Sequence, residues 1–171
     1  MNDPNEGSFW GVDVKTYPAE SEFEEDKVYA FVADLFGRVY VFDVSASQIF
    51  PAVQLPYLPY SSTPPQPPPS APILTPMRTI TFMPEPADGL APNCVDIEID
   101  EDFAYVALAK GGVAILDLSV DPALASPTLV DVMDTPGVAV GVTFRRILGV
   151  ATHLVVGDTR CGMRLYGKSG P

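Results

Sequence analysis

Short stretches of the chain alternate in side-chain type with the period of two that is typical of β-strands. The clearest case is segment 28–45, VYAFVADLFGRVYVFDVS, in which Val39 and Val41 alternate with aromatic residues. Gly37 lies between two such runs and provides the positive φ that a tight hairpin turn needs. The segment therefore predicts two strands joined by a turn.

The same hairpin pattern occurs three times. Segment 102–119, DFAYVALAKGGVAILDLS, aligns with the first without a gap and is identical to it at seven positions. A third copy, 152–169, THLVVGDTRCGMRLYGKS, keeps a turn glycine and the final serine but has Gly167 where the other two have aspartate. Internal repeats of this length indicate a repeat architecture.

Further apolar segments extend each hairpin into a larger unit. Strands are predicted before the hairpins at 11–14, 94–99 and 139–143. Strands are predicted after two of them at 78–83 and 127–132. The unit has four strands, named A to D here, and from Val95 to Val140 it spans 45 residues, the size of a β-propeller blade. A β-sandwich with similar hairpins is the alternative.

We therefore expect an all-β fold of β-propeller-type four-stranded antiparallel blades, forming an incomplete ring of about three blades in a single domain, 1–171. Blade 1 is expected at 9–84 with a Pro-rich insertion at 48–77, blade 2 at 92–135, and blade 3 at 137–170 without strand D. Closed propellers have about four to eight blades. An arc of about three leaves two apolar faces open, which favours a longer chain or assembly with another copy or subunit.

The C strands of the first two hairpins resemble a known repeat. Residues 111–119, GGVAILDLS, and residues 37–45, GRVYVFDVS, are similar to the LVIVD repeat, whose family forms β-propellers. The resemblance covers about 110 of the 171 residues in pieces, with the Pro-rich insertion excluded. It implies exported or surface-exposed proteins without assigned catalysis, and so a binding or structural role.

Charge and hydropathy exclude several classes of function. The formal net charge is −12 and the pI is near 4.2, so binding to nucleic acid or to an anionic membrane surface is disfavoured. No apolar run is long enough for a transmembrane helix. The first twenty residues predict no signal peptide; the compartment is therefore open, and only the resemblance favours an extracytoplasmic one.

Two connections of blade 1 are longer than a blade needs. The A–B connection carries the acidic residues Glu20, Glu22, Glu24, Glu25 and Asp26. The C–D connection carries the candidate contact residues Tyr57, Tyr60, Pro64, Pro65, Pro67, Pro68 and Pro69. Long connections are usually functional or disordered, and in a blade these two open on the same face. We expect a partner-binding surface there; a solvated acidic loop and a passive polyproline-II excursion are the alternatives.

The sequence carries no recognisable catalytic or cofactor motif. Asp96, Glu98 and Asp100 are weak candidates for a metal site, but they lack the glycine and the distal glutamate of a calcium loop. They are better interpreted as the polar side of a strand and its turn. We expect no cofactor.

Other polar and aromatic residues have structural interpretations. Asp43 and Asp117, each followed by a serine two residues later, are expected to cap the turn after strand C. Phe9 and Trp10 are expected to fill the core between blades. Cys94 and Cys161 are expected to be separate thiols, with a disulfide as the alternative.

The functional hypothesis is a non-catalytic scaffold that mediates protein–protein interaction through the connections of blade 1. An accessory subunit of a larger assembly, which buries the open blade faces, is one alternative. The other is a piece of a longer propeller whose metal or ligand site is completed by residues outside this chain.

Overall fold

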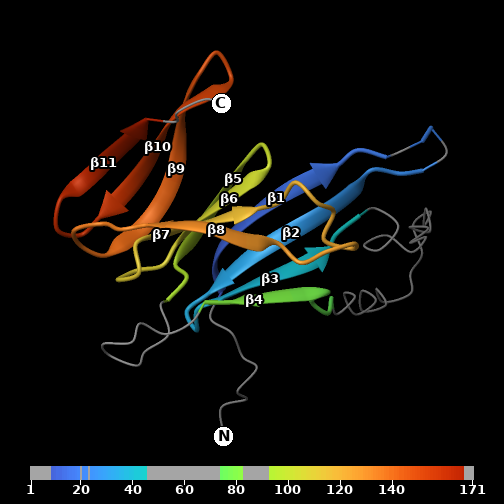
Figure 1. The fold of residues 1–171 in the computed structure, drawn as a ribbon, viewed down its shortest axis with the longest axis horizontal. Coiled ribbons are helices and arrows are strands. Elements are labelled where there is room, and N and C mark those ends of the chain that lie inside the picture. Colours follow the sequence, from blue (N-terminus) through green and yellow to red (C-terminus); the bar gives the residue numbers. More distant parts are fainter. Residues whose placement is uncertain (1–8, 20, 23, 46–73, 83–92, 168–171) are drawn as a thin grey trace, which may run out of the picture.

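The computed structural model describes residues 9–19, 21–22, 24–45, 74–82 and 93–167 (Figure 1). Within these residues all regular secondary structure is β, in three antiparallel sheets that follow one another along the chain. The all-β fold class with antiparallel blade-type sheets is thereby confirmed. The described sheets do not close into a ring.

Each sheet is an up-and-down meander, because strands adjacent in sequence are adjacent in space. Sheet 1 consists of β1 (Phe9–Tyr17), β2 (Lys27–Asp34), β3 (Arg38–Asp43) and β4 (Arg78–Thr81). Sheet 2 consists of β5 (Asp96–Asp100), β6 (Phe103–Ala107), β7 (Val113–Asp117) and β8 (Thr128–Met133). Sheet 3 consists of β9 (Ala139–Ile147), β10 (Val150–Asp158) and β11 (Gly162–Gly167).

The B–C turns are tight because a glycine takes the left-handed conformation in each. Gly37, Gly112 and Gly162 have φ angles of 74°, 76° and 75°, which side chains other than glycine rarely tolerate. A Cβ on Gly112 would also collide with the carbonyl oxygen of Met133. The hairpins predicted from the glycines are confirmed.

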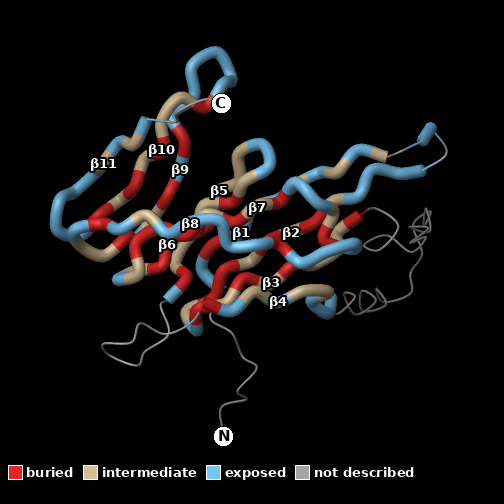
Figure 2. The backbone as a smooth tube through the Cα atoms, viewed as in Figure 1, coloured by how far each residue is buried: buried red, intermediate tan, exposed pale blue. Residues whose placement is uncertain are grey.

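Sheet 2 lies between the other two and shares a hydrophobic core with each (Figure 2). Phe31 of sheet 1 and Leu116 of sheet 2 are fully buried in the first core. Val113 of sheet 2 and Leu154 of sheet 3 are buried in the second. The molecule is therefore a stack of sheets in which each contacts only its sequence neighbours, as the blades of a propeller do.

The A strands β1, β5 and β9 lie beside one another, as they do around a propeller axis. Asp13 Oδ2 on β1 accepts a hydrogen bond from the backbone amide of Ile99 on β5 at 2.6 Å. Asp96 Oδ2 on β5 accepts one from the amide of Val142 on β9 at 2.9 Å. These carboxylates satisfy edge amides that would otherwise be unpaired.

The expectation that Phe9 and Trp10 fill the core is wrong. Their side chains are 56% and 66% exposed. The register of β1 against β2 shifts between Phe9 and Gly11, and a Cβ on Gly11 would already lie 2.7 Å from the Cα of Asp96. At Gly11, therefore, no side chain fits between β1 and β5. The Phe9 ring instead lies beside the ring of Tyr40, with 5.8 Å between the ring centroids.

Candidate functional site

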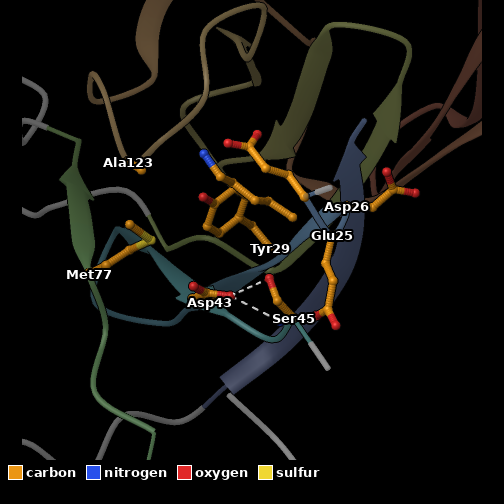
Figure 3. A pocket seen from close by; sticks show the side chains of 9 residues that line it. Glu25, Asp26, Tyr29, Asp43, Ser45, Met77 and Ala123 are labelled. Carbon is orange, nitrogen blue, oxygen red and sulfur yellow. Dashed lines mark hydrogen bonds between the residues drawn. The ribbon is translucent and has the colours of Figure 1, made fainter. Parts of the chain in front are cut away.

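A cleft opens at the end of sheet 1 where its A–B and C–D connections leave the strands (Figure 3). Its volume is about 400 Å³, and it is lined by Glu24, Glu25, Asp26, Lys27, Tyr29, Asp43, Ser45, Met77 and Ala123. A second hollow of about 310 Å³ shares part of this lining and extends to Tyr17, Asp121 and Leu124. Sheets 1 and 2 thus contribute jointly to one hollowed surface.

Asp121, in the connection that follows β7, links sheet 2 to the cleft side of sheet 1. Its Oδ2 accepts a hydrogen bond from Lys27 Nζ at 2.8 Å. Its Oδ1 accepts bonds from the Tyr29 hydroxyl at 2.8 Å and from the backbone amide of Ala123 at 2.7 Å. This carboxylate therefore ties Lys27 and Tyr29 of sheet 1 to the connection that follows β7.

The charge states in this network follow from its geometry. Burial opposes ionisation of Asp121, but the bonds from Lys27, a backbone amide and Tyr29 outweigh it, so the carboxyl pKa is lowered. Burial, and then the charge or hydrogen bond of Asp121, raises the pKa of both Tyr17 and Tyr29. Both phenols therefore stay protonated, and Tyr17 donates to the carbonyl oxygen of Leu118 at 2.7 Å.

Asp43 and Asp117 cap the turn after strand C in sheets 1 and 2, as predicted. Asp43 Oδ1 accepts bonds from the amide and the hydroxyl of Ser45 at 2.9 and 2.6 Å (Figure 3). Asp117 Oδ1 accepts one from the amide of Ser119 at 2.7 Å, and this bond is the main cause of the lowered pKa of that carboxyl. In sheet 1 the cap forms one wall of the cleft.

The cleft lining carries more negative than positive charge. Glu24, Glu25 and Asp26 are exposed side chains of the A–B connection. Lys27 is the one positively charged residue among the described lining residues, and its ammonium group forms an ion pair with Asp121. The three acidic side chains therefore face solvent without a cation of the cleft to neutralise them all.

The predicted contact residues are only partly within the described chain. Glu24, Glu25 and Asp26 line the cleft, whereas Glu22 is exposed in the same connection but is not part of the lining. The candidates outside the described residues are Glu20, Tyr57, Tyr60, Pro64, Pro65, Pro67, Pro68 and Pro69. Ser45 and Met77, on either side of the segment that holds the prolines, both line the cleft.

The weak metal candidates have other partners. Arg146 Nη1 lies 3.1 Å from Glu98 Oε1, and Arg146 Nη2 lies 3.5 Å from Asp100 Oδ1. Asp96 is bonded to the amide of Val142. Across the described residues, no three His, Cys, Asp or Glu side chains gather in a way that could hold a metal ion.

Sequence reasoning missed two buried carboxylates that organise the B–C turns. Asp34 is fully buried, accepts a bond from the amide of Arg38 at 3.0 Å and forms an ion pair with its guanidinium at 2.7 Å. Asp158 holds the amides of Arg160 and Gly137 at 2.8 and 2.9 Å. The signal was available, because both end strand B at the same position of the repeat. Neither lines the cleft.

Comparison with known proteins agrees with this architecture. No curated protein matches the chain. In the described part of the chain, no helix is long and apolar enough to cross a membrane. Residues 93–135, which include the whole of sheet 2, match the LVIVD repeat. This stretch is therefore an LVIVD repeat, of a repeat family associated with β-propeller folds.

Proposed function

We propose that the chain is a non-catalytic protein-interaction scaffold whose cleft binds a basic segment of a partner protein. The observation that carries the proposal is the acidic cleft itself. Glu24 and Glu25 line a hollow of about 400 Å³, and the lysine beside them is already bonded to Asp121. A Lys or Arg side chain from a partner would meet more carboxylates than cations among the described lining residues.

The cleft walls are held in place before any partner arrives. Asp121 joins Lys27 and Tyr29 to the connection after β7, and Asp43 fixes Ser45 on the opposite wall. Preorganised walls lower the ordering cost that binding would otherwise incur. This supports a binding role for the hollow.

The chemistry of the lining supports a non-catalytic role. The cleft lining carries two hydroxyl groups. Ser45 Oγ donates to Asp43 and accepts from the amide of Val28, and the Tyr29 hydroxyl donates to Asp121. A serine nucleophile needs a general base such as histidine to accept its proton. The described lining contains no histidine and no cysteine.

The test uses a fluorescein-labelled hexa-arginine peptide and fluorescence anisotropy at low ionic strength. The double variant Glu24→Gln/Glu25→Gln should weaken peptide binding about fivefold, which corresponds to roughly 1 kcal/mol for two partly exposed charge pairs. The matched control is Asp131→Asn/Asp134→Asn, which removes the same charge from exposed positions at β8. It should change the affinity less than twofold.

Equal losses of peptide affinity in the two double variants would mean that the peptide responds to net charge alone, and would refute the cleft as the site.

A chain with residues 48–73 replaced by a Gly-Ser linker tests the second connection. It keeps Met77, whose amide donates to the carbonyl oxygen of Val41 at 2.8 Å. If the Pro-rich connection contributes to the surface, this variant should also bind the peptide more weakly than the native chain.

A further inference from the structure

One face of sheet 1 has no described partner, although it is apolar. Val12 and Val14 on β1 are 63% and 49% exposed. Val12 pairs with Val32 on β2, which pairs with Tyr40 on β3, so these side chains share the face that points away from sheet 2. Buried Phe31 points the other way, into the core with sheet 2. The open face of sheet 1 thus exposes apolar side chains of β1, with Arg38 and Thr79 beside Tyr40 as its polar members.

The outer face of sheet 3 is also open. Thr143 on β9 pairs with Val155 on β10, which pairs with Leu165 on β11. Leu165 is 48% exposed and Met163, two residues before it, is 69% exposed. The opposite face carries Leu154 and packs on sheet 2.

The repeat register shows how these two faces relate to the interfaces already formed. Phe31 of sheet 1, Tyr105 of sheet 2 and Val155 of sheet 3 occupy the same position of the repeat. Phe31 packs toward sheet 2 and Tyr105 toward sheet 3, whereas Val155 faces outward. In the same way, Val32 on the open face of sheet 1 is equivalent to buried Val106, which faces sheet 1. The open face of sheet 3 therefore corresponds to the side of each sheet that packs on the next sheet, and the open face of sheet 1 corresponds to the side that packs on the preceding one. Together they have the two sides that each existing interface combines.

The charges at the end of each A strand follow the same repeat. Lys15, Asp100 and Arg145 are equivalent, since they pair with equivalent residues of the B strands. Lys15 Nζ bonds Asp102 in the A–B turn of the next sheet at 2.6 Å. Asp100 lies 3.5 Å from Arg146 of the next sheet. Each existing interface thus pairs opposite charges at this position.

Arg145 is the third member of the series, and it is exposed on β9. By the geometry of Lys15 it would face the A–B connection of whichever sheet follows sheet 3. The A–B connection of sheet 1 carries Glu24, Glu25 and Asp26. The open face of sheet 3 is therefore complementary in charge, as well as in apolar character, to the open face of sheet 1.

We propose that the open face of sheet 3 packs on the open face of sheet 1 of a second copy of this chain, and that two copies close one ring. Two copies, each with three sheets among its described residues, supply six blades, within the range of about four to eight found in closed propellers. The contact is head to tail, and a twofold rotation closes it with two identical interfaces. This goes beyond the proposed function, although the acidic connection that would meet Arg145 also contributes Glu24, Glu25 and Asp26 to the cleft lining.

The mass of the 171-residue chain in solution, measured by light scattering after size exclusion, tests the proposal. We expect twice the chain mass of 18.3 kDa. A stable mass of one chain would overturn the proposal, as would a broad distribution of larger species, because a head-to-tail contact that does not close gives open filaments.

Two variants locate the interface. Val12→Asp places a charge in the open face of sheet 1, and Arg145→Glu reverses the charge on sheet 3. Each should raise the dimer dissociation constant about tenfold or more, as expected when a charge is buried unpaired or faces a like charge. The control Val130→Asp changes a valine of similar exposure, 57% on β8 against 63% for Val12, and should leave the dimer intact.

Circular dichroism identifies a variant that fails to fold. Because Arg145 is exposed, Arg145→Glu keeps the test decisive if Val12→Asp unfolds. A dimer that survives in folded Val12→Asp and Arg145→Glu refutes these two faces as the interface. Binding of the hexa-arginine peptide to the monomeric variants is measured separately, so that failure of the ring and failure of the cleft are distinguishable.

Discussion

Cys94 and Cys161 show how environment sets the chemistry of a single side chain. Cys94 is fully buried in the core between sheets 1 and 2, whereas Cys161 is exposed in a turn of sheet 3. Burial, followed by the charge of Asp34, raises the pKa of the Cys94 thiol to about 12. Both cysteines are free, in line with the expectation of two separate thiols.

We predict that one thiol of the native protein reacts rapidly with Ellman's reagent at pH 8 and that the second reacts only on unfolding. The thiolate is the reactive species, and Cys94 is both inaccessible and protonated at that pH. Cys161→Ser is the control and should abolish the rapid phase. Two rapid equivalents in the native protein would contradict the buried position of Cys94.

Asp34 is the residue at which a single substitution should be most damaging to a turn. Asp34→Ala removes the acceptor of two backbone amides and the partner of Arg38. We expect a loss of about 3 kcal/mol in the free energy of unfolding, measured by urea denaturation. Asp34→Asn keeps one oxygen acceptor for the turn and should cost less. Equal losses in the two variants would show that the ion pair alone matters.

Sequence distance decides which of these residue roles could be predicted. Asp43 and Asp117 were identified as caps because their serine partners lie two residues away. Asp121 was not, because its partners Lys27 and Tyr29 lie 94 and 92 residues earlier in the chain. A cleft formed by such distant contacts follows only from the arrangement of the sheets.

At the scale of elements, strands were predictable and their lengths were not. The repeat and its glycines predicted the hairpins, which depend on local alternation and turn geometry. The A strand of sheet 3 was expected to end at residue 143 but continues to Ile147. There Arg146 pairs with Ala151 of β10 across the hairpin, and its guanidinium contacts Glu98 of β5, a contact that local alternation does not reveal.

The connection between β7 and β8 should make stability depend on pH through Asp121. Its pKa is lowered in the folded state from an unfolded value of about 3.9. The stabilisation is therefore present above about pH 4 and is lost as the pH falls through the folded pKa. Asp121→Asn should lower the free energy of unfolding by about 2 kcal/mol at pH 6. The difference in this free energy between the variant and the native chain should be smaller at pH 3. Urea denaturation measures the free energy of unfolding of both proteins at the two pH values. A difference between them that is the same at pH 6 and pH 3 would contradict this linkage.

At the scale of the whole molecule, the sheets are held at a distance that their A strands set. Three sheets stacked through two cores bring β1, β5 and β9 together. Alternation along the chain predicted the sheets but not the close contact between their A strands, because the residues in contact come from different repeats. Asp96 was interpreted as part of the polar side of a strand, yet Asp96 and Asp13 both accept hydrogen bonds from the backbone of the neighbouring sheet.

Substitutions of Gly11 and Gly141 test how closely the A strands of neighbouring sheets pack. They occupy the same position of the repeat on β1 and β9, each beside Asp96 on β5. A Cβ on Gly11 would lie 2.7 Å from the Cα of Asp96 and 2.8 Å from the amide nitrogen of Ile97, both backbone atoms. A Cβ on Gly141 would lie 3.4 Å from a carboxylate oxygen of Asp96, an ordinary contact.

Gly11→Ala should therefore force sheets 1 and 2 apart and lower the free energy of unfolding by about 2 kcal/mol, the usual cost of overpacking. Gly141→Ala should change it by less than about 0.5 kcal/mol, because the small contact cost is offset by the reduced freedom of the unfolded chain. Urea denaturation of both variants at neutral pH measures the difference. Equal effects would mean that the approach of Gly11 to the backbone of Asp96 does not set the spacing of sheets 1 and 2.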